Sequence, residues 1–197
     1  PYDGTLLSQV MEHYANRGRA KDCLALAQHA KQNSLPMSVT THHHIIASLL
    51  PSNPIIAINY LHSLEAQHHT PLLETYTLLI RTLLLPTSPS YLVSRGWDLY
   101  AHTRLVAHPI PSVPLYSTMI QACATGPHPS PERAIDLFTE MTEDNKLPPA
   151  EAAYNGVIRA CAREGTVAYY FEALRFMKRM LDTNVEPTKF TFNALLE

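Results

Sequence analysis

The chain has 197 residues, of which 46% are hydrophobic, so it is long enough to bury a sizeable core. Fifteen Lys and Arg against seventeen Asp and Glu give a formal net charge of −2, which excludes a bulk positive field that would attract nucleic acid or an anionic membrane. Three cysteines without a C-x-x-C pair disfavour a disulfide framework or a zinc cage, and no apolar run reaches the roughly 20 residues of a membrane span.

The predicted elements are pairs of helices that recur along the chain. In chain order, each unit opens on an anchor residue followed by about a dozen residues of helical pattern, then a Gly or Pro breaker, then a second apolar-periodic stretch such as "AIDLFTEM" from Ala134. A hydrophobic residue and a proline close each unit, because proline cannot continue the helix. The anchors step by 35, 34, 40, 38 and 38 residues, and they are Leu7, His42, Tyr76, Tyr116, Tyr154 and Phe192.

These patterns predict an all-α fold. One helix pair cannot bury both of its apolar faces, so stacked pairs are expected to form an α-solenoid of antiparallel helix-turn-helix repeats of about 35–40 residues. We expect a single array over residues 1–197. Because the last helix of the sequence is cut short, the array is expected to be a fragment of a longer protein. The expected repeats are 4–38, 39–72, 73–112, 113–150 and 151–188, with a partial repeat at 189–197.

The segment from Tyr154 to Thr188, "YNGVIRACAREG…EALRFMKRMLDTNVEPT", resembles the pentatricopeptide repeat, a 35-residue helical hairpin. It shares Tyr-Asn at the start of the first helix, a small residue seven positions later, Gly after that helix, Ala-Leu in the second helix and a proline-containing end. The nearest alternative is the tetratricopeptide repeat, which has Trp and Leu-Gly early in its first helix. The only tryptophan here, Trp97, falls in a second helix instead. The resemblance covers essentially the whole chain and implies a right-handed superhelix.

The resemblance implies binding of single-stranded RNA, either mRNA or rRNA, in RNA processing, stability or translation in an organelle, with the mitochondrion expected. One repeat is then expected to read one base through two residues, the one after the anchor and the last one of the repeat. The implied pairs are Ser8 with Ser38, His43 with Leu72, Thr77 with Ser112, Ser117 with Ala150, and Asn155 with Thr188, and Asn193 opens a sixth pair.

Phosphate contacts are expected from arginines on the first helices, because Lys and Arg supply most of the affinity for RNA. The candidates are Arg81, Arg159 and Arg163, and Lys189 opens the sixth repeat. No Lys or Arg occurs from Gln32 through Ile80, however, where six histidines fill the gap.

A second reading therefore stays open, in which the same solenoid holds protein partners or sits on the mitochondrial ribosome without reading sequence. The closing residues of the implied pairs favour it. They are Ser, Leu, Ser, Ala and Thr, where family members with clear base preference have Asp or Asn.

Catalytic motifs do not occur: the sequence has no Gly-rich phosphate loop, no H-E-x-x-H and no G-x-S-x-G. We expect no enzymatic activity, no cofactor and no small-molecule substrate. The run His42-His43-His44 is not expected to bind metal, because neighbours on a helix point about 100° apart. His42 is expected in the core as an anchor, the aromatic anchors are expected to be core residues, and packing accounts for Cys23, Cys123 and Cys161.

Overall fold

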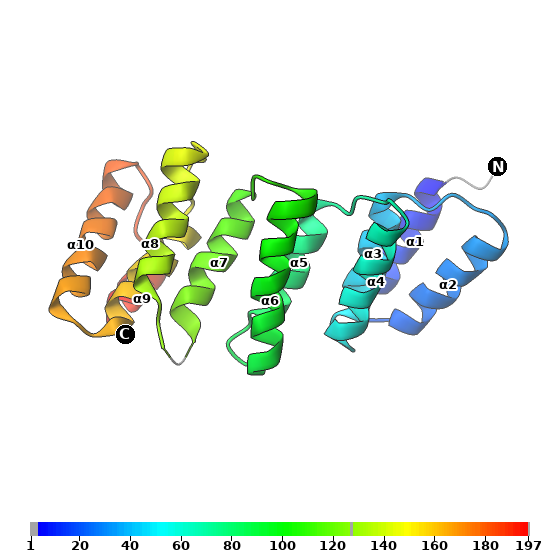
Figure 1. Cartoon of the computed structure of the whole chain (residues 1–197), viewed down its shortest axis with the longest axis horizontal. Helices are drawn as coiled ribbons and strands as arrows, with labels where there is room; N and C mark the ends of the chain where they lie inside the picture. The colour runs from blue at the N-terminus through cyan, green and yellow to red at the C-terminus, as the bar shows by residue number, and fades with distance from the viewer. Residues whose placement is uncertain (1–3, 127, 197) are drawn as a thin grey trace. The chain divides into compact units, whose positions relative to one another are not determined.

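The computed structural model describes residues 4–126 and 128–196, and the regular elements in these ranges are all helices (Figure 1). The predicted all-α fold is confirmed. Two five-residue π-helical turns, η1 and η2, extend α6 and α8. The elements are α1 (Gly4–Asn16), α2 (Ala20–Gln32), α3 (Val39–Leu49), α4 (Pro54–Ala66), α5 (Leu73–Leu83), α6 (Ser90–His102), η1 (Thr103–Ala107), α7 (Val113–Thr125), α8 (Pro131–Thr139), η2 (Glu140–Asp144), α9 (Glu151–Glu164), α10 (Val167–Asp182) and α11 (Lys189–Leu196).

The helices divide into two compact units. The first comprises Pro1–Leu83 with Ser94–Pro109, and the second comprises Leu84–Val93 with Ile110–Glu197. Within each unit the first helices of successive predicted repeats lie against one another, α1 on α3 and α3 on α5 in the first unit, and α7 on α9 and α9 on α11 in the second. Each second helix packs against the first helix of its own repeat in the pairs α1 with α2, α3 with α4, α7 with α8 and α9 with α10.

Local sequence explains where several helices begin and end. Ser38 and Asn53 accept backbone N–H bonds at the N-termini of α3 and α4, and Thr166 does the same for α10. Gly165 follows α9 with a φ of 76°, a left-handed conformation that favours glycine and ends the helix.

The aromatic anchors form the centre of the core. Tyr76, Tyr116 and Tyr154 are each 0% exposed, which confirms their predicted core role. Their hydroxyl groups are paired as well: Tyr76 donates to Glu65, and Tyr116 donates to Oε1 of Glu140 at 2.7 Å. The hydroxyl of Tyr154 lies 2.9 Å from that of Thr183, after α10. A buried phenol with its hydroxyl satisfied joins hydrophobic packing to a specific hydrogen bond. The predicted core role is wrong for Phe192, the last anchor, which is 50% exposed, because α11 buries Thr191 and Ala194 instead.

His42 takes the anchor place in α3 and is buried, as predicted. Its Nδ1 lies 2.9 Å from the hydroxyl of Tyr60 in α4. In this repeat the anchor on the first helix is therefore a histidine, and the tyrosine is its hydrogen-bond partner on the second helix. Burial lowers the pKa of His42, and the neighbouring His69 lowers it further. The imidazole is therefore neutral in the folded protein at neutral pH.

The three cysteines lie free and buried, which agrees with a packing role. Burial raises the pKa of Cys123 to about 11 and that of Cys161 to about 12. Both thiols stay protonated at neutral pH and are poor nucleophiles.

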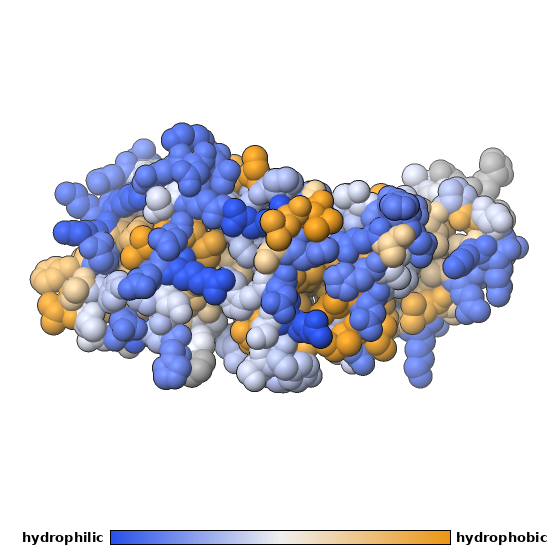
Figure 2. Space-filling model, viewed as in Figure 1, coloured by the Kyte–Doolittle hydropathy of each residue, from blue (hydrophilic) through white to orange (hydrophobic). Residues whose placement is uncertain are grey.

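The surface carries both hydrophilic and apolar side chains. Figure 2 shows hydrophilic residues over much of one face, with apolar areas between them. The most exposed large apolar residues include Leu105, Val167 and Leu196. Among the described residues, no helix combines the length and the apolar character that crossing a membrane requires.

Gly156 lets α9 approach α7 closely. A Cβ at this position would lie 2.9 Å from Cγ2 of Ile120 and 3.2 Å from the backbone nitrogen of Gln121. Gly156→Ala is expected to lower the free energy of unfolding, because overpacking costs about 1–3 kcal/mol and alanine's better helix propensity returns only about 1 kcal/mol. Urea unfolding monitored by circular dichroism measures the change. Gly4→Ala is the matched control, since its Cβ would meet only the carbonyl oxygen of Pro36 at 3.6 Å; an equal loss in both variants would contradict the packing argument.

Because His42 is neutral in the fold, the stability of the protein is expected to fall in acid. The unfolded chain takes up a proton near pH 6.5, whereas burial depresses the pKa of His42 in the fold, so the unfolded state binds more protons in acid. Stability is expected to be complete above about pH 6.5 and to fall as the pH drops through the folded pKa. Thermal unfolding of the wild type and His42→Gln, at about pH 7.5 and about pH 5.5, measures this. The variant's midpoint should change less with pH, and an identical decline in both proteins would contradict the assignment.

Candidate nucleic-acid interface

The residues that follow the anchors occupy equivalent places on the first helices. Ser8, His43 and Thr77 lie on α1, α3 and α5 of the first unit, and Ser117, Asn155 and Asn193 lie on α7, α9 and α11 of the second. We call these six positions the slot residues. Because each directly follows an anchor, its side chain points about 100° around the helix from the buried one. Accordingly Asn193 is exposed, Ser8, His43, Thr77 and Asn155 are half-buried, and Ser117 is buried with 7% exposed.

The first predicted pair is brought together through a threonine of the next helix. The hydroxyl of Ser8 donates to Oγ1 of Thr40 at 3.3 Å, and Oγ of Ser38 lies 2.7 Å from the same Thr40 oxygen. Ser38 also caps α3, because its Oγ accepts the backbone N–H of Thr41 at 3.2 Å. Ser8 and Ser38 thus meet at one polar position, and Ser38 also caps α3 there.

The last complete predicted pair converges on a carboxylate. Nδ2 of Asn155 donates to Oε1 of Glu151 at 3.1 Å, and the hydroxyl of Thr188 donates to the same oxygen at 2.6 Å. Oδ1 of Asn155 is buried and has no hydrogen-bond partner among the described residues. A buried acceptor without a donor costs about 1–3 kcal/mol, so this amide oxygen is an unsatisfied position beside the predicted pair. Asn155, Glu151 and Thr188 form the most polar cluster along the slot.

His43 pairs with the next helix rather than with its predicted partner. Its Nδ1 lies 2.8 Å from Oγ1 of Thr75 in α5, and Leu72 offers no polar side-chain atom. Burial lowers the pKa of His43, with a smaller contribution from His44 in the same direction. The predicted second repeat, which lacks Lys and Arg, therefore gains no positive charge from His43 at neutral pH.

Two slot hydroxyls donate to their own helices. Thr77 donates to the carbonyl of Leu73 at 2.9 Å, and Ser117 donates to that of Val113 at 2.8 Å. Each hydroxyl keeps a free lone pair as an acceptor, so both positions suit a base N–H donor better than a base acceptor. Their predicted partners differ in kind, because Ser112 caps α7 by accepting the N–H of Leu115 and Ala150 has no polar side-chain atom.

The arginines lie on the same helical stripes as the slot residues. Arg81 follows Thr77 by four residues on α5 and is exposed. Arg159 and Arg163 follow Asn155 by four and eight residues on α9, and both are half-buried. Residues at this spacing share one face of a helix. Arg163 donates to the carbonyl of Ala124 near the C-terminus of α7, so part of its hydrogen-bonding capacity serves the fold.

Sequence reasoning missed Thr40 and Glu151, although both have a recognisable position. They lie in the first turn of a first helix, two and three residues before the anchor. Glu151 is also four residues before Asn155, the spacing at which helical side chains meet. It also missed a set of metal-binding residue types, His62, Glu65 and His102, which come from second helices.

Solved structures of pentatricopeptide repeat proteins share this fold. The PPR domain of Arabidopsis thaliana protein-only RNase P 1, in complex with tRNA, matches with a TM-score of 0.72 and 15% sequence identity over 98% of this chain and 96% of that chain. PPR10 in complex with an 18-nt psaJ RNA element matches with a TM-score of 0.69 and 22% identity over 98% of this chain and 27% of that chain. PPR10 from maize gives a TM-score of 0.51 at 15% identity, and covers 98% of this chain and 31% of that chain.

This chain therefore spans less than a third of the length of PPR10. No protein-family model matches it, and a comparison with curated proteins finds no match either. The structural matches establish the fold, and the predicted resemblance to pentatricopeptide repeats is confirmed at that level.

The capping role of Ser38 can be tested in the absence of RNA. Ser38→Ala removes the acceptor for Thr41 N–H and is expected to lower the free energy of unfolding by about 1 kcal/mol. Urea unfolding measures the loss. Ser63→Ala is the control, because that hydroxyl only donates to the carbonyl of Tyr60 within α4 and its loss is expected to be close to neutral. Equal effects of the two substitutions would contradict the capping role.

Proposed function

We propose that this chain binds single-stranded RNA along the slot residues of its first helices, as part of a protein acting in mitochondrial RNA processing, stability or translation. The observation that carries the proposal is the polar cluster of Asn155, Glu151 and Thr188, in which the two positions that the resemblance assigns to base reading share one carboxylate. The cluster offers acceptors and donors of the kind that read a Watson–Crick edge.

The cluster also limits which groups of a base fit. The Glu151 carboxylate is an acceptor only, and the buried Oδ1 of Asn155 is an acceptor in need of a donor. Both favour a base that presents N–H groups. Thr77 and Ser117 add acceptor lone pairs, because their protons are committed to their own helices. Asn155, Thr77 and Ser117 are thus each suited to a base edge that presents N–H donors.

Few positively charged side chains lie near the slot residues to bind phosphate groups. Arg81 is exposed on α5 one turn after Thr77, while the slot around His43 lacks fixed positive charge. With few cations near the slot, the number of counterions released is small. Binding is therefore of moderate affinity and shallow in its salt dependence.

Structural neighbours support the proposal as proteins of the same fold. PPR10 is in complex with an RNA element, and the PPR domain of protein-only RNase P 1 is in complex with tRNA. The proposal assigns this chain a binding role without catalysis. The competing role, a scaffold for proteins or for the mitochondrial ribosome, is favoured by the absence of Lys and Arg from the predicted second repeat and by the apolar closing residues Leu72 and Ala150.

RNA binding is tested by fluorescence anisotropy with random-sequence single-stranded RNA at two salt concentrations. Arg81→Ala is expected to weaken binding several-fold for all sequences and to flatten the slope of log K against log salt by about one. Arg175→Ala is the matched control, because Arg175 is an exposed arginine on a second helix, α10, where it pairs with Glu172 at 2.5 Å. Its affinity should equal that of the wild type.

Two outcomes would overturn the proposal. One is the absence of RNA binding at low salt, which would favour the scaffold. The other is an equal loss in Arg81→Ala and Arg175→Ala, which would show attraction by overall charge rather than by the slot. Asn155→Ala should alter base preference more than overall affinity, which a competition with homopolymeric RNAs measures.

A further inference from the structure

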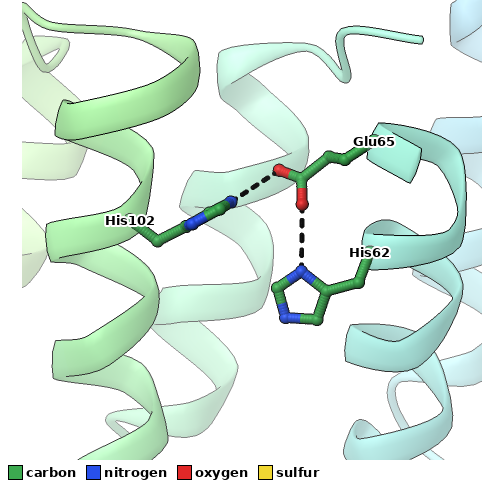
Figure 3. Close-up of side chains that lie close together, drawn as sticks. All are labelled: His62, Glu65 and His102. Atoms are coloured by element: carbon green, nitrogen blue, oxygen red, sulfur yellow. Dashed lines mark hydrogen bonds and ion pairs between the residues drawn. The ribbon is translucent and has the colours of Figure 1, made fainter. Parts of the chain in front are cut away.

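A second polar cluster lies in the first unit, between two second helices. His62 and Glu65 lie one turn apart on α4, and His102 is the last residue of α6. One ligand atom from each lies within 4.8 Å of the others. In Figure 3 the carboxylate of Glu65 lies between the two imidazoles, and each ring turns a nitrogen toward it.

The ligand atoms of the three side chains lie near the separations expected around one metal ion. Nδ1 of His62 lies 2.9 Å from Oε2 of Glu65, and Nε2 of His102 lies 2.9 Å from Oε1. The two imidazole rings have centroids 5.5 Å apart and meet at 87°. Ligands at about 2.0–2.2 Å from a tetrahedral Zn²⁺ stand roughly 3.3 Å from one another. The three ligand atoms, which all lie within 4.8 Å of one another, must therefore shift to separations of about 3.3 Å to hold one ion.

A hydrogen bond from a neighbouring helix orients the carboxylate. The buried Tyr76 of α5 donates its hydroxyl proton to Oε1 of Glu65. An anionic carboxylate held by an outer hydrogen bond is the usual arrangement around protein-bound metals.

The cluster is reached from solvent. The side chains of His62, Glu65 and His102 are 49%, 17% and 33% exposed. A cavity of about 120 Å³ runs along both imidazoles, and Arg95 and Asp98 of α6 line it with opposite charges. This cavity gives water and ions access to the two imidazoles, while Glu65 is not part of its lining.

We propose that His62, Glu65 and His102 bind a divalent transition-metal ion of the Zn²⁺ type, and that this ion ties α4 to α6. Two imidazole nitrogens and a carboxylate oxygen are a ligand set that suits zinc, whereas Mg²⁺ and Ca²⁺ prefer oxygen ligands alone. The ion links the second helices of two successive predicted repeats. This site is separate from the slot residues and does not depend on RNA binding.

Isothermal titration of the whole chain with Zn²⁺ is the primary experiment. The wild type is expected to bind one Zn²⁺ per chain. His102→Ala, which removes a ligand, should weaken binding by at least about 100-fold, and Tyr76→Phe, which removes only the outer hydrogen bond, by about 10–100-fold. His29→Ala is the matched control, because His29 is exposed on α2 beside Asn33 and far from the cluster in sequence. Its affinity should be unchanged.

Thermal unfolding supplies a second readout. Zn²⁺ should raise the midpoint of the wild type and of His29→Ala, and a chelator should reverse the rise, because a ligand that binds only the folded state stabilises it. His62→Asn changes a half-exposed side chain and keeps the helix, which circular dichroism checks. Equal Zn²⁺ affinity in wild type, His62→Asn and His102→Ala, or no binding by the folded wild type, would overturn the proposal and leave a hydrogen-bonded His-Glu-His cluster.

Discussion

The structure depends on burying a polar aromatic ring at the anchor position of α3, α5, α7 and α9. A helix pair cannot cover both of its apolar faces, so each first helix presents its anchor to neighbouring helices. Tyr116 and Tyr154 are fully buried, yet each hydroxyl has a hydrogen-bond partner at or after the end of the second helix of its own repeat. The phenol thus fills the core and also fixes the distance between the two helices of a repeat through its hydrogen bond. In α3 the same function is divided between His42 and Tyr60.

The candidate interface follows from that constraint. Once the anchor is buried, the next residue is rotated toward the side of the helix, where it meets the following first helix. This explains why Ser8 contacts Thr40 and why His43 contacts Thr75. Asn155 instead meets Glu151 of its own helix, α9, and Thr188, just before α11, donates to the same carboxylate. The metal-binding cluster has the same origin, because Tyr76 turns its hydroxyl to Glu65 of the preceding second helix.

Much of the fold was predictable because its determinants are local and periodic. Anchor spacing and proline ends predicted the helix pairs, and the three tyrosine anchors are buried as expected. The predicted pair partners were harder, since Ser38 and Ser112 also cap helices, which a resemblance does not reveal. His62 and His102 are 40 residues apart in sequence and share no motif. Only the packing of α4 near α6 brings them to one carboxylate.

The central claim is that the slot residues bind the bases of a single strand. Nuclear magnetic resonance of the ¹⁵N-labelled chain during titration with a short single-stranded RNA tests it most directly. The account predicts saturable shifts of the side-chain amides of Asn155 and Asn193 and of the backbone amides around Ser117, with little change along α10. Shifts confined to α10 and the other second helices, or no shift at all, would contradict it.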